Sequence, residues 1–311
     1  MSNLEQQCSP SLSSDCPDTA RQPVSEIIDT RDAVLGEGLT IRRALPSRRR
    51  RMIGAWCFLD HAGPADVGED PGIRVGPHPH IGLQTFTWPV TGELLHRDSL
   101  GYEQIIRPGQ VNLMTAGRGI SHSEESPTER SPEFHGAQLW IALPDAERHR
   151  EPGFEHYPEQ PQLNRDGFVI TVVAGEALGE LAPAQVYSPL VGMDLYTRGE
   201  AQTRLPLNPA FEYGALLLEG SVEIDGQPLN IGQLLYLGCG REQLTVRADQ
   251  TARLLLLGGE PFGEEILMWW NFVGRSKQEM IRATRDWNEG DRFGQVQNYD
   301  GPRLTAPATP W

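Results

Sequence analysis

Short apolar runs, each broken by glycine, proline or aspartate, repeat along most of the chain. They are four to eight residues long and rich in leucine, valine, isoleucine, threonine and aromatic residues: Leu83–Val90, Val111–Thr115, Ala137–Leu143, Phe168–Val173, Ala215–Leu218, Gln233–Leu237 and Ala252–Leu257. Runs of this length, composition and punctuation are typical of strands in sandwiches and barrels. Long amphipathic helical stretches are nearly absent. The pattern therefore predicts an all-β fold.

One segment near the end of the chain, Ser276–Asn288, has a helical pattern instead. Ser276 followed three residues later by Glu279 forms a capping box, and Gly290 stands where a helix would stop. The side chains that then share one helical face are Met280, Ile281, Thr284 and Trp287. We expect a short C-terminal helix that packs against a sheet.

The chain of 311 residues is long enough for about two domains. A charged, proline-rich segment separates two β-rich halves, and a polar segment rich in serine, glutamine and proline precedes the first half. We predict a mobile, disordered tail over residues 1–23, a first domain over 24–143, a linker over 144–161, and a second domain with the terminal helix over 162–311.

The two halves resemble each other in sequence. His78–Gly92 aligns with Pro206–Gly220 at an offset of 128, and Gly109–Arg118 aligns with Gly232–Arg241 at an offset of 123. The difference of five residues falls in a loop, where insertions cost little. A shared Gly-Gln, a shared Gly-Arg and the same hydrophobic rhythm indicate a duplicated domain.

All eight histidines precede Tyr157. Two of them, His78 and His80, are spaced i, i+2, and His122 and Glu124 repeat that spacing some forty residues later. Residues at this spacing point to the same face of a strand. Opposed across a barrel, the two pairs would offer three nitrogens and one oxygen, a set that suits iron, nickel, copper, manganese or zinc. Of the other five histidines, we expect His61 to lie in a structural turn and His96, His135, His149 and His156 to be exposed.

The second half lacks all four candidate ligands. Under the two offsets their counterparts are Pro206, Asn208, Thr245 and Arg247, although the surrounding scaffold residues persist. A loss confined to the ligand positions favours one metal-binding domain beside one domain without a metal site. The alternative, an exposed histidine pair with no metal, accounts for an isolated His-X-His but not for this joint loss.

The net charge of −15 opposes direct binding to nucleic acid or to an anionic membrane surface. The start of the chain has no basic and apolar signal segment, and no apolar run approaches the length of a membrane span. Four widely spaced cysteines predict reduced thiols rather than a disulfide framework. We therefore expect a cytoplasmic protein, and a monomer, because two tandem domains can cover each other's apolar surface.

The strings FLDHAGPAD, PHPHIGLQTFTWPVTGEL and RPGQVNLMTAGRGISHSEE strongly resemble the pirin family of the cupin superfamily. The resemblance extends from about Val24 to the segment WWNFVGRSKQEM. It implies a bicupin, two tandem cupin β-barrels with one mononuclear centre in the N-terminal barrel. The implied ligands are His78, His80, His122 and Glu124. Fe²⁺ is the implied metal, with nickel, copper, cobalt, manganese and zinc as alternatives.

One position departs from the family pattern. The first cupin motif usually has a glutamate four residues after its second histidine, and Gln84 stands there. The implied ligand set is intact, because its carboxylate comes from the second motif. A neutral Gln84 removes one candidate base, although it could still hydrogen-bond a ligand or a bound water.

Two functions follow from the resemblance. Some pirins resemble quercetinases, which insert both oxygen atoms of O₂ into a flavonol and release carbon monoxide, and here Glu124 would be the base that takes the 3-hydroxyl proton. Other pirins are redox-sensing regulators that respond to the oxidation state of iron. In that case this chain would act through a protein partner, as a transcription cofactor or an enzyme regulator.

Overall fold

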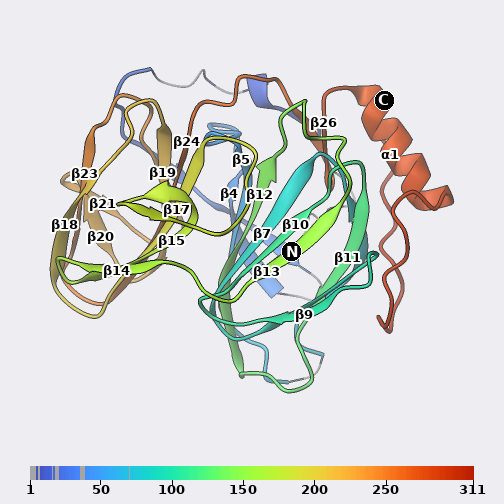
Figure 1. Ribbon diagram of the computed structural model, residues 1–311, viewed down its shortest axis with the longest axis horizontal. Helices are drawn as coiled ribbons and strands as arrows, with labels where there is room; N and C mark the ends of the chain where they lie inside the picture. The colour runs from blue at the N-terminus through green and yellow to red at the C-terminus, as the bar shows by residue number, and fades with distance from the viewer. Residues whose placement is uncertain (1–4, 6–7, 16, 18–20, 36–38, 70) are drawn as a thin grey trace.

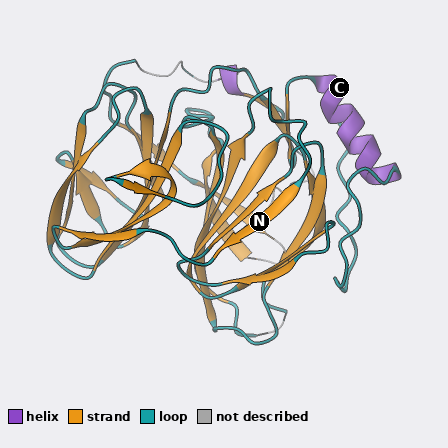
Figure 2. Cartoon of the chain, viewed as in Figure 1, coloured by secondary structure: helices purple, strands orange, loops and turns teal. Residues whose placement is uncertain are grey.

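The computed structural model describes residues 5, 8–15, 17, 21–35, 39–69 and 71–311. Strands dominate these residues, and they form two β-domains that lie side by side (Figures 1 and 2). Each domain consists of one large and one four-stranded antiparallel sheet. The predicted all-β fold with two tandem barrels is confirmed.

The first domain carries the strands on which the predicted ligands lie. Its large sheet has the order β13 (Gly153–Tyr157), β10 (Val111–Thr115), β7 (Leu83–Thr91), β12 (Glu133–Ala142), β5 (Trp56–Asp66), β4 (Leu39–Leu45) and β3 (Arg31–Leu35). Its smaller sheet has the order β6 (Arg74–His80), β11 (Ile120–Glu125), β8 (Leu94–Asp98) and β9 (Glu103–Ile106).

The second domain repeats this arrangement. Its large sheet has the order β14 (Gln162–Arg165), β15 (Phe168–Ala177), β17 (Leu190–Thr197), β24 (Ala252–Gly259), β19 (Glu212–Glu219), β22 (Gln233–Tyr236) and β2 (Glu26–Asp29), and β16 (Glu180–Leu181) pairs with β15. Its smaller sheet has the order β18 (Ala201–Pro206), β23 (Gln243–Ala248), β20 (Val222–Ile224) and β21 (Gln227–Leu229).

The domains exchange edge strands. The N-terminal strand β2 pairs with β22 in the second domain, and β13, which lies inside the predicted linker, pairs with β10 in the first. An edge strand donated by the neighbouring segment covers backbone groups that would otherwise be open to pairing with other chains. The boundaries at residues 23, 143 and 161 stay predictions.

A third, small sheet combines the two ends of the chain. It consists of β1 (Ser11–Leu12), β25 (Leu267–Trp269) and β26 (Phe272–Gly274), and a 3₁₀ turn over Ser13–Asp15 follows β1. The tail prediction therefore does not describe Ser11–Asp15, because Leu12 packs against the aromatic cluster around Trp269. Other parts of the predicted tail, at residues 1–4, 6–7, 16 and 18–20, lie outside the described residues.

The helix α1 (Lys277–Glu289) is the single α-helix among the described residues, and it forms as predicted. The Ser276 side chain accepts a hydrogen bond from the Glu279 amide and the Glu279 side chain accepts one from Ser276, so the capping box is complete. Its buried face consists of Met280, Ala283, Thr284 and Trp287. No helix in the described part of the chain has the length and apolar composition needed to span a membrane.

The largest apolar cluster lies between the two large sheets and joins the domains. It combines Trp56, Phe86 and Leu139 of the first domain with Leu216 and Leu255 of the second. Side chains on the opposite face of each large sheet point into that domain's own barrel. The interior of the second barrel holds a large apolar cluster, whereas that of the first barrel also holds the candidate ligands.

Candidate metal centre

Two neighbouring strands, β6 and β11, bring three predicted ligands together. His122 lies directly opposite His78, and His80 lies opposite Ile120, so the strand register places the three imidazoles on one face. Their possible ligand atoms all lie within 4.8 Å of one another. His78, His80 and His122 are at most 1% exposed, which places the group inside the barrel.

Hydrogen bonds from the backbone orient the rings of the β6 histidines. His78 Nδ1 donates to the Gly76 carbonyl at 2.8 Å, and His80 Nδ1 donates to the Asn271 carbonyl at 3.0 Å. Each bond leaves Nε2 as the available donor to a metal. The Nε2 atoms of His80 and His122 are 3.1 Å apart, and His78 Nε2 has no hydrogen-bond partner among the described residues. Three imidazole nitrogens therefore converge in a buried site.

Burial sets the charge of these rings. Desolvation lowers the pKa of His80 to about 3, and it is also the main reason why the pKa values of His78 and His122 lie well below the usual value. All three rings are therefore neutral at neutral pH. A neutral imidazole is the form that binds a metal, so the donor set is ready for a cation without losing protons first.

A fourth buried histidine adjoins the group. His96 Nδ1 is 3.3 Å from His122 Nδ1, and His96 Nε2 is 3.1 Å from the Asp98 carboxylate. The His96 ring stacks on Phe154 with a centroid distance of 4.3 Å. The prediction that His96 is exposed was wrong, because these partners bury the residue to 5% exposure. The His96-Arg97-Asp98 spacing on β8 repeats the i, i+2 signal of the other pairs.

Glu124 lies on β11 two residues after His122 and is 1% exposed. It is opposite His96 on β8, and that pairing is regular between His122 and Glu124. The register shift near this point belongs to the β6 side, where Glu124 is opposite Val75. Glu124 therefore shares the interior face with His122. The compact nitrogen group does not include its carboxylate, so its role as a fourth ligand stays a prediction.

Family models match both halves of the chain. The pirin model matches residues 38–141, and the model of the pirin C-terminal cupin domain matches residues 192–294. The chain belongs to the pirin family. A Pseudomonas aeruginosa protein named as a candidate quercetin 2,3-dioxygenase is 54% identical over 313 residues, covering 100% of this chain and 98% of its own length.

Solved structures agree with this membership. A crystal structure of quercetin 2,3-dioxygenase from Acinetobacter baumannii has a TM-score of 0.90 and 49% identity, covering 92% of this pirin and 96% of that chain. A bacterial pirin from Escherichia coli, in complex with nickel(II), has a TM-score of 0.59 and 21% identity, covering 76% and 100%. At that identity the second likeness shows the shared fold.

The wall opposite the imidazoles is aromatic in this pirin. The Trp140 ring meets the His80 ring edge to face at a centroid distance of 5.1 Å, and Phe58 stacks on Trp140 at 4.0 Å with an angle of 12°. Flat apolar surfaces of this kind suit a planar aromatic ligand. A cavity of about 660 Å³ reaches this wall, with Phe58, Trp140 and Arg43 among its lining residues.

Gln84 does not face the metal centre, and the hydrogen-bond partners of its amide are not metal ligands. Its side chain lies on the same face of β7 as Phe86, towards the second domain. Gln84 Nε2 donates to Thr115 Oγ1 and to the Gln185 carbonyl, both at 3.0 Å. Gln84 thus helps to join the domains.

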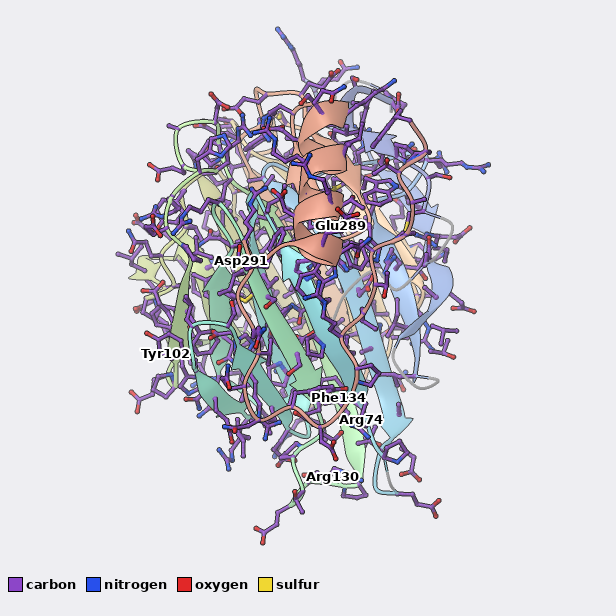
Figure 3. All side chains as sticks on the ribbon, turned by 90° about the vertical axis from the view of Figure 1, so that its right-hand side faces the viewer. Arg74, Tyr102, Arg130, Phe134, Glu289 and Asp291 are labelled. Carbon is purple, nitrogen blue, oxygen red and sulfur yellow. The ribbon has the colours of Figure 1, made fainter. Side chains whose placement is uncertain are left out.

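The C-terminal segment supports the metal strands from outside. Leu304 N donates to the Pro77 carbonyl at 2.9 Å, and Ser121 Oγ donates to the Phe293 carbonyl at 3.0 Å. Figure 3 shows α1 ending near Glu289, and the chain beyond Asp291 running across this side of the domain towards Arg74. The segment that carries Asn271, α1 and the chain end therefore fixes β6 and β11 in place.

The second barrel holds apolar residues where the ligands stand. Leu205 of β18 lies opposite Leu244 of β23, as His78 of β6 lies opposite His122 of β11, and both leucines belong to the second core. Of the counterparts inferred from sequence, Pro206, Asn208 and Arg247 are exposed instead. The counterparts of His78, His80, His122 and Glu124 are therefore Leu205, Leu207, Leu244 and Val246 rather than Pro206, Asn208, Thr245 and Arg247. These four apolar residues belong to the second core. The three-histidine group thus belongs to the first barrel.

Proposed function

We propose that this pirin is a metal-dependent dioxygenase of the quercetin 2,3-dioxygenase type, which cleaves a flavonol with O₂ and releases carbon monoxide. The observation that carries the proposal is the buried group of His78, His80 and His122, whose Nε2 atoms converge beside an aromatic wall. The relatives with 54% and 49% identity bear the name of this activity.

The residues present fit a divalent transition metal. Three neutral imidazoles are the donor set that iron, nickel, copper and zinc share, and the orphaned His78 Nε2 lies among them. We propose Fe²⁺ as the native ion, with nickel, copper, cobalt, manganese and zinc as alternatives. When bound, such an ion supplies Lewis acidity towards a substrate oxygen and eases electron transfer to O₂.

Glu124 is proposed as the fourth ligand and as the general base. Its side chain is buried on the same face of β11 as His122. It would accept the proton of the 3-hydroxyl group, which makes the flavonol oxygen anionic. The three imidazoles can hold a metal while the carboxylate takes part in proton transfer.

The wall of Phe58 and Trp140 is proposed to position the substrate. Two stacked aromatic rings beside His80 present a flat, apolar surface that excludes water from the reacting atoms. A flavonol is planar, so it can lie against this surface with its oxygen atoms towards the imidazoles.

The test is aerobic incubation of metal-reconstituted protein with quercetin. We expect the flavonol absorbance to decay, O₂ to be consumed and carbon monoxide to be released in equal amounts. His78→Ala, which removes one nitrogen ligand, serves as the matched inactive control. Absence of turnover with iron, nickel, copper, cobalt and manganese alike would overturn the proposal.

The regulatory alternative stays a prediction, as do the cytoplasmic location and the monomeric state. A pull-down with ferrous and ferric protein separates regulation from catalysis. A partner retained in one oxidation state, by a protein that does not turn over flavonols, would favour a redox-sensing regulator.

A further inference from the structure

A row of polar side chains crosses the large sheet of the first domain, one from each of six adjacent strands. Each of these residues lies directly opposite the next one on the neighbouring strand. Together they form what we term the polar row: His156, Asn112, Thr87, Gln138, Asp60 and Arg43. Residues paired in this way point to the same face of a sheet.

The polar row faces the imidazoles. Trp140 lies two residues after Gln138 on β12, and its ring contacts His80. Phe154 lies two residues before His156 on β13, and its ring stacks on His96. Because side chains alternate along a strand, Gln138 and His156 share the face of these aromatic rings. The polar row and the metal ligands are thus on opposite walls of one barrel.

The polar row is costly to bury. Gln138 and Asp60 are 0% exposed and Arg43 is 3% exposed. Arg43 and Asp60 form a bidentate ion pair, with Nε–Oδ1 at 2.7 Å and Nη2–Oδ2 at 2.8 Å. Thr87 Oγ1 donates to Gln138 Oε1 at 2.9 Å, whereas Gln138 Nε2 has no hydrogen-bond partner among the described residues. An unmet buried donor destabilises a fold unless a ligand or water accepts its bond.

The second barrel shows that the fold does not need a polar row. At the same sheet positions, its strands carry Ile27, Leu235, Ala215, Leu256, Met193 and Val172. These residues are all apolar, and Leu256 stands in the place of Gln138. Two copies of one architecture therefore differ in the wall facing the metal site as well as in the ligands themselves. A structural role alone does not explain six polar substitutions in the copy that holds the histidines.

We propose that the polar row recognises the oxygen groups of the substrate, with Gln138 Nε2 donating a hydrogen bond to one of them. The ligand class is a planar polyhydroxylated aromatic that carries an oxygen acceptor remote from its metal-bound oxygen. Arg43, at one end of the row, lines the cavity of about 660 Å³ together with Phe58 and Trp140, so this cavity adjoins the wall that carries the row. The inference rests on the proposed flavonol dioxygenase function and names Gln138 as a specificity residue within it.

Gln84 provides a matched comparison within the same sheet. It is also a glutamine with 0% exposure, but it lies on the opposite face, towards the second domain. Its Nε2 group already donates to Thr115 and to the Gln185 carbonyl. Replacing either glutamine removes a buried amide from the large sheet, and only Gln138 faces the imidazoles. The pair therefore separates recognition from general destabilisation.

The experiment compares Gln138→Leu, which copies Leu256, with Gln84→Leu in metal-loaded protein. Anaerobic titration measures the Kd of quercetin and of 3-hydroxyflavone, which lacks the remote hydroxyl groups, and aerobic assays measure turnover. We expect Gln138→Leu to weaken quercetin binding on the order of 10-fold and to leave 3-hydroxyflavone binding within about twofold. Gln84→Leu should leave the ratio of the two Kd values as in the wild type. Gln138→Met replaces Gln138→Leu if the latter does not fold.

Equal weakening of both flavonols, or wild-type binding of quercetin by Gln138→Leu, would overturn the recognition role. Selective loss of quercetin binding in a protein without turnover would support that role and overturn the dioxygenase. Flavonol turnover by the wild-type protein, with no selective loss of quercetin binding in Gln138→Leu, would support the dioxygenase and overturn the recognition role. Failure of the wild-type protein to bind any flavonol would overturn both.

Discussion

His78 and His122 lie directly opposite each other on the antiparallel strands β6 and β11, with their ring centroids 4.3 Å apart. A metal held by these rings would link two strands that are far apart in sequence. We predict that His78→Ala reduces the metal content after dialysis by at least about tenfold. The loss of a direct ligand should lower the metal affinity at least as much as the loss of a residue that supports a ligand. Elemental analysis of the purified protein measures the effect.

The control for this loss is Asn208→Ala in the second domain. Asn208 is exposed, and the second barrel has apolar residues at all four ligand positions. The variant should retain the wild-type metal content and activity. Metal loss in Asn208→Ala would show that the second domain takes part in metal binding.

Glu124→Gln should separate metal binding from proton transfer. The substitution preserves the size of the side chain, and the three imidazoles remain to hold the metal. We predict that the variant keeps part of its metal, whereas kcat for flavonol cleavage falls on the order of 100-fold, the usual contribution of a positioned base. Stopped-flow decay of the flavonol absorbance, normalised to metal content, measures this. Turnover at the wild-type rate would exclude Glu124 as the base.

The histidine ligands could be found from the sequence because strand geometry is simple. A period of two residues puts His78 and His80 on one face, and any antiparallel partner with the same spacing can complete the group. The fold was predictable for a similar reason, since strand runs and turn residues recur in both halves. The resemblance to pirins then implied the same ligands, and the family membership is confirmed.

Other parts of the site depend on pairing between distant strands, which the sequence does not reveal. The polar row becomes visible only when six strands are placed in register, and Gln138 has no motif of its own. Gln84 occupied a motif position, yet its face of β7 is turned towards the second domain. The sequence offsets placed the counterparts of the ligands one residue away from the positions that face the second core. Asn271 contributes a backbone carbonyl, which carries no residue-type signal.

A second pair of histidines should make stability depend on pH. The Nε2 atoms of His61 and His135 are 2.8 Å apart, and the side chains are buried on the face of the sheet away from the metal. Burial, with the neighbouring His135, lowers the pKa of His61 to about 3, and burial with Arg253 and Arg42 lowers that of His135 to about 4. The prediction that His135 is exposed was therefore wrong.

The sign of the effect follows from the unfolded state, where an imidazole has a pKa of about 6.5. The folded protein binds fewer protons than the unfolded chain below that pH, so stability falls as the pH drops from about 6.5 towards the folded pKa values. At pH 5, the proton uptake of each histidine in the unfolded chain should lower the free energy of unfolding by about 2 kcal/mol. We predict that His135→Gln reduces the difference in unfolding free energy between pH 7 and pH 5 by about 2 kcal/mol.

Urea unfolding of the metal-loaded protein at the two pH values measures this difference. His149→Gln is the control, because His149 is exposed and outside the pair. An unchanged pH dependence in His135→Gln would mean that other buried groups dominate acid unfolding.

The ion pair between Arg43 and Asp60 should behave as a unit. Both side chains are buried, and the Arg43 guanidinium also lies 4.4 Å from the Phe58 ring centroid. Removing one partner leaves the other charge in a low-dielectric interior, so Asp60→Met alone should lower the unfolding free energy by about 3–5 kcal/mol. The double variant Arg43→Val with Asp60→Met copies Val172 and Met193 of the second barrel and should recover most of that loss. A double-mutant cycle in urea measures the coupling, which we expect to be at least about 2 kcal/mol. Additive effects of the two single substitutions would show that each charge is solvated independently, and would contradict the buried pair.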